Sequence, residues 1–428
     1  MNQRVVVTGL GVIAPNGNGI PEFELALRKG KSGLRVEESM VEAKLGCHVA
    51  GVPQGVDELA AASFDEDLLL AMNSSHRYVA LASVEAWKSA GLEVPAPGDD
   101  AVDWDAGGVI GTGVGGMDTM GARVVPLVDA KKARRIGSTG VEQVMASGPS
   151  ARVSGILALG NHVTTNSSAC ATGVEAIALG ADRIRRGLAK RMICGGTEGA
   201  SVYTWAGFDA MRVLCRKFND DPEKASRPMS ASAGGFIAGA GAGMVVLESE
   251  ESATERGVEI HAEIAGSAMN CGGHRMGGSM TSPNPESVRR CIRGALADAG
   301  VAPSEVDAIS GHLTATGADP KEVAAWADAL ERKPGELPPI TATKSMIGHG
   351  LGAAGAMEAI AALLMLKGGF VHASLNCEDV HPEIEPWANS IPHELLELPE
   401  LPELRTLVKA GFGFGDVNAA LVMRRYEP

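Results

Sequence analysis

The chain has 428 residues, 45% of them hydrophobic, which is long enough to bury one large core or two closely packed ones. A formal charge of -14 and the lack of a long basic tract argue against a nucleic-acid partner, because phosphate binding needs clustered Lys and Arg. Seven cysteines without a CxxC pair favour neither a disulfide framework nor a zinc site, and without a signal segment or a long apolar run we expect a cytoplasmic protein that does not enter a membrane.

The first half of the chain alternates short apolar runs with helical segments. The runs at 4–9 and 108–113 (RVVVTG and GVIGTG) end in glycine and are typical of buried strands. The segment 171–187 places apolar residues at steps of three and four, which predicts a helix with one buried face. Cys170 is therefore expected where a strand gives way to a helix.

The second half repeats this pattern. The segments TTNSSACATGVEAIALGADRIRRG and ITATKSMIGHGLGAAGAMEAIAALLMLKGG share a strand, a polar turn and an Ala- and Gly-rich helix, and AGMVVLESEE and NAALVMRRYE resemble equivalent closing strands. This similarity predicts an internal duplication with halves at about 1–250 and 260–428. No long linker rich in Pro, Gly and Ser separates the halves, so we expect one layered α/β body.

Cys170 is the first candidate for chemistry. A thiol at a helix N-terminus gains thiolate character from the oriented N–H groups, and the small, polar segment 167–169 before it leaves its sulfur accessible. A Cys in an Ala-rich turn is also commonly a small packing residue, so both interpretations stand on this evidence. If Cys170 is a nucleophile, we expect it to be the most readily alkylated of the seven cysteines.

Two histidines, His312 and His349, follow apolar runs and stand at predicted strand or loop ends, where active sites collect. Each alone is as compatible with a structural role as with catalysis. Lys344 lies shortly before His349, and Glu358 follows on a helix rich in Ala, Ile and Leu. A charge there is costly unless it is paired, which predicts an ion pair between Lys344 and Glu358. Metal ligation is not favoured, because no further ligand lies at metal-site spacing.

Two glycine patterns keep an NAD-dependent oxidoreductase as a weak alternative. GLGVIA at 9–14 and GTGVGG at 111–116 fit the glycine spacing of a dinucleotide-binding turn. Neither has a clear acidic residue about 20 residues further on, so tight turns in a Gly-rich fold are favoured.

Four motifs in order make the pattern recognisable: ACATG around Cys170, GH at 311–312, TKSMIGHGLGAAGAMEAI at 343–360 and GFGFGDVN at 411–418. Together they resemble the β-ketoacyl-acyl-carrier-protein synthases of the KAS I and KAS II group, over nearly the whole chain. The resemblance implies a thiolase-like layered α/β/α/β/α fold of two similar duplicated halves. It also implies a homodimer, acyl carrier protein as partner, no metal or organic cofactor, and decarboxylative condensation of an acyl chain with a malonyl thioester in fatty-acid or polyketide-like biosynthesis.

The resemblance assigns roles to particular residues. Cys170 would accept the acyl group, and His312 and His349 would serve malonyl decarboxylation and condensation. Lys344 and Glu358 would organise the two histidines.

The remaining candidates would shape the pocket. Phe414 would be the gate residue, and its backbone N–H would form an oxyanion hole with that of Cys170. Thr314 and Thr316 would contact the pantetheine arm. Further polar residues for substrate would be Thr281 and Asn418.

The chain departs from the family pattern at several positions. Leu313 stands where the family has Gly, in a segment one residue shorter, and Asp416 replaces a glycine of the gate loop. The segment 233–236 reads AGGF, and Ala240 stands where an acid is usual. These changes are expected to alter the pocket floor, a charged network and the gate loop, and they leave substrate choice open. A noncatalytic chain-length partner is the main alternative, and the retained Cys170 argues against it.

Overall fold

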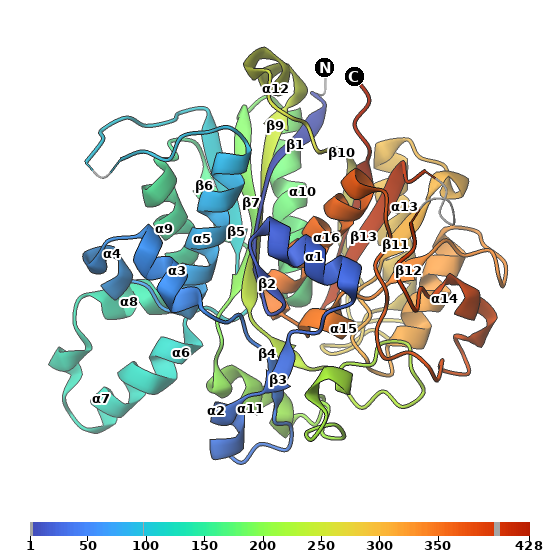
Figure 1. Ribbon diagram of the computed structural model, residues 1–428, viewed down its shortest axis with the longest axis horizontal. Helices are drawn as coiled ribbons and strands as arrows, with labels where there is room; N and C mark the ends of the chain where they lie inside the picture. The colour runs from blue at the N-terminus through green and yellow to red at the C-terminus, as the bar shows by residue number, and fades with distance from the viewer. Residues whose placement is uncertain (1–2, 97, 398–402) are drawn as a thin grey trace.

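The computed structural model describes residues 3–96, 98–397 and 403–428. The two halves of the chain order their strands in the same way (Figure 1). The first half runs, from the middle of the main sheet outward, β1 (Val5–Ala14), β9 (Gly241–Ser249), β7 (Arg191–Glu198), β5 (Ala106–Gly111) and β6 (Val163–Thr164). The second half runs β10 (Ala262–Cys271), β14 (Val417–Arg424), β13 (Thr406–Gly413), β11 (Ala308–Ser310) and β12 (Ile340–Thr341).

The strand directions match as well. In each half the first two pairings are antiparallel and the next two are parallel. The predicted duplication is thereby confirmed, and the predicted closing strands, β9 and β14, occupy equivalent places. The halves meet where β1 pairs with β10, with Val6 opposite Glu263 and Val7 opposite Ala262.

Helices form three layers around these strands. α10 (Thr172–Arg185) and α16 (Ala354–Gly368) lie in the middle, between the strands of the two halves. The outer layers consist of α5 (Ser74–Ser89) and α9 (Gly148–Leu157) on the first half, and of α13 (Pro285–Ala299) and α14 (Asp319–Ala329) on the second. This is the layered α/β/α/β/α arrangement of the thiolase-like fold, as predicted.

Shorter elements complete the chain. A small sheet contains β3 (Leu34–Val36), β4 (Val49–Gly51) and β8 (Ala238–Gly239), and β2 (Gly17–Asn18) pairs with β1. The remaining α-helices are α1 (Ile20–Lys29), α2 (Glu38–Glu42), α3 (Val56–Ser63), α4 (Glu66–Leu70), α6 (Met117–Thr119), α7 (Val125–Asp129), α8 (Thr139–Val144), α11 (Val202–Ala210), α12 (Glu250–Arg256) and α15 (Lys344–Ile347).

The two central helices approach each other at glycines. A Cβ atom on Gly173 would lie 2.4 Å from the backbone nitrogen of Ala356, and one on Gly355 would lie 2.6 Å from the Val174 side chain. Larger residues at these positions would force the helices apart. The close approach brings the chain segments that lead into α10 and α16 together, and each of these segments carries a candidate catalytic residue.

The helix α16 is apolar apart from Glu358 and Lys367. The stretch Leu351–Gly368 is long and hydrophobic enough to cross a membrane, but 89% of it is buried inside the protein. A helix that is hydrophobic all round is expected at the centre of a large protein, where strands and helices cover every face.

The glycine patterns that suggested dinucleotide binding have other uses. Gly9 and Gly11 lie inside β1, and a Cβ on Gly11 would be 1.9 Å from the Ala82 carbonyl oxygen of α5. In the second pattern, the Gly113 N–H donates to the Glu198 carboxylate at 2.8 Å. The first pattern is thus part of a strand packed on a helix, and the second binds a side chain of this protein. The oxidoreductase interpretation of these glycines is wrong.

Candidate active site

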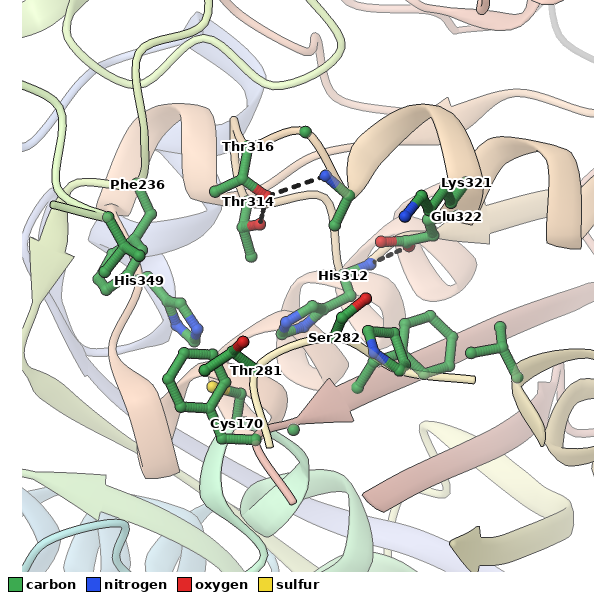
Figure 2. A pocket seen from close by; sticks show the side chains of 18 of the residues that line it. Cys170, Phe236, Thr281, Ser282, His312, Thr314, Thr316, Lys321, Glu322 and His349 are labelled. Carbon is green, nitrogen blue, oxygen red and sulfur yellow. Dashed lines mark hydrogen bonds between the residues drawn. The ribbon is translucent and has the colours of Figure 1, made fainter. Parts of the chain in front are cut away.

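Cys170 lies in a tight turn between β6 and α10. It is the middle residue of a 3-10 turn, Ala169–Ala171, that leads directly into the helix. Ala169 has a φ of +46°, in the left-handed region that residues with a Cβ rarely adopt. The predicted transition from strand to helix at Cys170 is confirmed. The turn places the sulfur on the wall of a cavity of about 320 Å³ (Figure 2).

The surroundings of the thiol favour its neutral form. Burial raises the pKa of Cys170 to about 11, although the Lys344 ammonium and a hydrogen bond from the Phe414 backbone N–H act in the opposite direction. Desolvation of the charged form is the larger effect. The burial of Cys170 therefore contradicts the expectation of thiolate character at the helix terminus. Cys271 is exposed, whereas Cys170 is only partly accessible, so preferential alkylation of Cys170 is not supported either.

The two histidines face each other beside this sulfur. The ring centroids of His312 and His349 are 5.4 Å apart, and the Cys170 sulfur and one nitrogen of each ring lie within 4.8 Å of one another. His312 follows β11 and His349 follows α15. The structure thus brings together a residue of the first half and two residues of the second.

The hydrogen bonds of the rings define their tautomers. The Leu351 N–H donates to Nδ1 of His349 at 3.2 Å, and the Lys344 ammonium lies 3.4 Å from Nδ1 of His312. A ring nitrogen that accepts a hydrogen bond carries no proton in the neutral ring, so the proton resides on Nε2. Each imidazole can then donate from Nε2 to a bound substrate.

Burial keeps both imidazoles neutral. The pKa values of His312 and His349 lie well below the usual value of 6.5, mainly because of desolvation and further because of the Lys344 and Lys409 charges. Two neutral N–H donors at one cavity can stabilise a negative oxygen that forms during a reaction.

Buried charged side chains lie next to the histidines, on the side away from the cavity. Lys344 and Glu358 are fully buried and form the predicted ion pair. The Lys344 ammonium also donates to the His312 carbonyl oxygen at 2.6 Å. Sequence reasoning missed Lys409, whose Nζ lies 2.6 Å from the second oxygen of Glu358. The available signal was a lysine in the apolar run that leads into the GFGFGDVN motif.

The gate loop expected around Phe414 is held in place by Asp416. Phe414 lines the cavity, 6.2 Å from the Phe208 ring centroid. Asp416 has a φ of +61°, and its carboxylate accepts from the backbone N–H groups of His274 at 3.0 Å and Asn284 at 2.7 Å. Asp tolerates this left-handed backbone. Asp416 therefore ties the gate loop to the facing loop at 272–284, which carries Thr281.

The threonine candidates lie on the cavity wall. Thr281, Thr314 and Thr316 all line it, and the hydroxyl oxygens of Thr314 and Thr316 are 3.0 Å apart. Phe236, which sequence reasoning missed, also lines the cavity and meets His349 edge-on, with ring centroids 5.2 Å apart. It ends the AGGF segment, whose first two residues, Ala233 and Gly234, line a neighbouring surface hollow instead of this cavity.

Three other expectations need correction. Asn418 does not belong to the described cavity wall: its amide donates to Asn270 at 2.9 Å and to Ser287 at 3.0 Å, and so joins β14 to β10 and α13. Leu313 is fully buried in the hydrophobic core of the second half and does not form the pocket floor. Ala240, expected to change a charged network, packs in a hydrophobic cluster with residues of α5.

Comparisons with known proteins identify the class to which this chain belongs. Residues 2–253 match the family model of the β-ketoacyl synthase N-terminal domain, and residues 261–378 match that of the C-terminal domain. The chain belongs to the β-ketoacyl synthase family.

Individual relatives cover the chain from end to end. It is 34% identical to "3-oxoacyl-[acyl-carrier-protein] synthase 1" of Haemophilus influenzae, over 99% of this chain and 100% of the relative. It is 35% identical to "3-oxoacyl-[acyl-carrier-protein] synthase I, chloroplastic" of Arabidopsis thaliana, over 100% of this chain and 87% of the relative.

Solved structures agree with the fold. A β-ketoacyl synthase from Burkholderia phymatum is 29% identical, with a TM-score of 0.89 over 99% of this chain and 100% of that one. The ishigamide ketosynthase/chain length factor is 30% identical, with a TM-score of 0.88 over 100% of both chains. A type II PKS acyl-carrier protein in complex with its ketosynthase bound to the hexaketide gives 27% identity and a TM-score of 0.87 over 100% of both chains.

The raised pKa of Cys170 leads to a prediction about its alkylation. With a pKa of about 11, the thiolate fraction is small at neutral pH. It should rise about tenfold for each pH unit between about pH 7 and pH 9. We expect the iodoacetamide rate constant at Cys170, followed by peptide mass spectrometry, to rise by the same factor. The exposed Cys271 in the same digests serves as the internal comparison. A rate at Cys170 that levels off below about pH 9 would contradict the prediction.

Proposed function

We propose that this chain is a β-ketoacyl-acyl-carrier-protein synthase that binds an acyl group at Cys170 and condenses it with a malonyl thioester. The observation that carries the proposal is one cavity into which a thiol and two neutral imidazoles open. Family membership and the names of the full-length relatives support the same reaction.

The first step is acyl transfer. The Cys170 sulfur attacks the carbonyl carbon of the acyl thioester, and the carbonyl oxygen becomes an oxyanion. The backbone N–H of Phe414, which acts to lower the pKa of the sulfur, and that of Cys170 are the proposed donors to this oxyanion. The carbon–sulfur bond to the carrier then breaks, and the carrier thiol leaves with the proton that Cys170 loses.

The second step is decarboxylation and condensation. Loss of carbon dioxide from the malonyl thioester leaves an electron pair that is delocalised as an enolate. The two Nε2–H groups of His312 and His349 donate to the enolate oxygen, and one such donor contributes about 3 to 4 kcal/mol in related sites. The enolate carbon attacks the acyl-Cys170 carbonyl, the bond between that carbon and the Cys170 sulfur breaks, and the Cys170 thiolate takes a proton from water. In this sequence of steps no metal or organic cofactor takes part.

The catalytic groups argue against a noncatalytic chain-length partner. Such a partner needs an acyl pocket but neither a nucleophile nor donors for an enolate. Here Cys170, His312 and His349 share one cavity, and Lys344 with Glu358 supports the histidines. An acyl group trapped on Cys170 and found by mass spectrometry would distinguish the two functions.

Acyl carrier protein is the proposed substrate carrier. The Thr314 and Thr316 side of the cavity adjoins a surface hollow whose lining includes Thr316 together with the exposed cations Arg212 and Lys217. A pantetheine arm carries a phosphate where it joins its carrier protein, and cations at the mouth attract it. The carrier-protein complex of the structurally similar ketosynthase supports this partner.

A homodimer is also proposed. β6 (Val163–Thr164) is the outermost strand of the first half in the described sheet. An open sheet edge is a site for pairing with another chain, and a second copy of the same strand would continue the sheet. This edge lies close in sequence to Cys170, so the partner would adjoin the acyl site.

The two histidines should act mainly after acylation. We expect His312→Ala and His349→Ala to transfer an acyl group from carrier protein to Cys170 but to lose about 100-fold or more in malonyl decarboxylation, because each change removes one donor to the enolate oxygen. Single-turnover assays of each half-reaction measure this, and His393→Ala, at an exposed position, is the control. A variant that decarboxylates and condenses at the parent rate would show that its histidine is structural.

The mouth of the cavity offers a test of the carrier. Reversing charge with Arg212→Glu and Lys217→Glu should raise the KM for carrier-bound acyl groups by about tenfold at low salt. The KM for a short pantetheine thioester without the protein should change less. Lys88→Glu, on an exposed face of α5, is the matched control. An equal change for both kinds of substrate would argue against carrier docking here.

Sedimentation measures the oligomeric state directly. We expect a species of twice the chain mass at micromolar concentration. Val163→Pro should shift it toward the monomer, because proline removes a backbone donor from the edge strand. A fully active monomer of the unsubstituted chain at this concentration would contradict the dimer.

A further inference from the structure

Lys409 is a buried charge that the proposed reaction leaves unexplained. It lies on β13 with an exposed fraction of 0%. Its ammonium donates to the carbonyl oxygens of Gly311 at 3.1 Å and Ala410 at 2.6 Å, and it contacts Glu358 Oε2 at 2.6 Å. A lysine loses its hydration at such a position. Burying the charge therefore costs free energy of folding unless contacts or a function compensate for it.

The contacts of Lys409 belong to a frame around the chain segment that carries His312. Lys409 binds the carbonyl oxygen of Gly311, and Lys344 binds that of His312. On the other side, the Glu322 carboxylate of α14 accepts from the backbone N–H of His312 at 2.6 Å and of Leu313 at 2.8 Å. Charged side chains therefore hold this peptide segment from both sides.

The frame contains more positive charge than Glu358 requires. Lys344 alone can neutralise Glu358, and Lys409 adds a second cation on the other carboxylate oxygen. Glu322 and Glu198 are further acids near the site, and burial raises the pKa of each to about 7, so both are only partly ionised at neutral pH. The His312 and His349 rings consequently lie beside an excess of positive charge.

We propose that Lys409 is a positioning residue for the condensation step, which fixes the His312 backbone and whose charge keeps the His312 and His349 imidazoles in their neutral, donating form. This proposal rests on the proposed function. The backbone contact sets the direction of the His312 Nε2–H. The charge opposes protonation of rings that must each carry one proton, on Nε2, to act with the tautomers described above.

Two substitutions separate the roles of shape and charge. Lys409→Met has a similar length and no charge, and Lys409→Gln retains an amide donor for a backbone carbonyl. Removing the cation raises the pKa values of the two histidines, so they become protonated at a higher pH. In the pH–rate profile of malonyl decarboxylation, the midpoint of the fall in rate on the acid side should therefore move up by about one pH unit in both variants.

The rates provide the second readout. At the pH optimum, Lys409→Met should decarboxylate about tenfold more slowly, because one hydrogen bond to the His312 segment is lost, and Lys409→Gln should lose less. Acyl transfer to Cys170 should stay within about twofold of the parent rate in both variants. Lys367→Met, which removes a half-exposed lysine from α16, should change neither the rates nor the pH profile.

The outcomes are distinguishable. If the acid side of the pH–rate profile does not shift and both half-reactions lose the same factor in rate, Lys409 has only a structural role and the proposal is wrong. Failure of the unsubstituted chain to acylate Cys170 or to decarboxylate would instead overturn the proposed function.

If the variants do not fold, a measurement on the unsubstituted protein still tests the proposal. Nitrogen NMR of the lysine side chains at pH 7 should show two exchange-protected ammonium groups, for Lys344 and Lys409. A neutral amine in place of either would overturn the role of the charge.

Discussion

The carboxylate of Glu358, held between two buried lysines, is the interaction on which the arrangement of the site depends. It lies on the central helix α16, surrounded by apolar residues, where a single uncompensated charge would be strongly unfavourable. Lys344 and Lys409 come from α15 and β13, so the ion pairs join three elements of the second half. Each lysine also donates to a backbone carbonyl oxygen in this segment, Lys344 to that of His312 and Lys409 to that of Gly311, and this couples the charge network to the orientation of the imidazole.

Desolvation determines the chemistry that this site can support. The same burial that makes ion pairing necessary raises the pKa of the Cys170 thiol and lowers the pKa values of both histidines. All three groups are neutral at neutral pH. Such a site is suited to donating hydrogen bonds to charge that develops during reaction, because its donors need no reorganisation when the negative oxygen forms.

The duplicated fold explains how residues distant in sequence meet. Equivalent turns precede α10 and α16, one with Cys170 and the other with His349, and the glycines where the two helices approach each other bring the turns together. His312 joins them from the end of β11, at the carboxyl end of a parallel strand, which is a common place for functional groups in α/β proteins. Each half supplies an incomplete set of groups, and the cavity between them contains the full set.

The sequence by itself determined the layered fold, the duplication and the ion pair between Lys344 and Glu358, because periodicity, motif order and the cost of a charge in an apolar helix are local or pairwise properties. It also singled out Cys170, His312 and His349 as candidates for the chemistry. Only the tertiary structure decided the ionisation of Cys170, the place of Asn418 away from the cavity, and the role of Asp416 as a fastening of the gate loop. It also revealed Lys409 as the second partner of Glu358. These features depend on which groups exclude water from one another, and exclusion of water is a property of three-dimensional packing rather than of spacing along the chain.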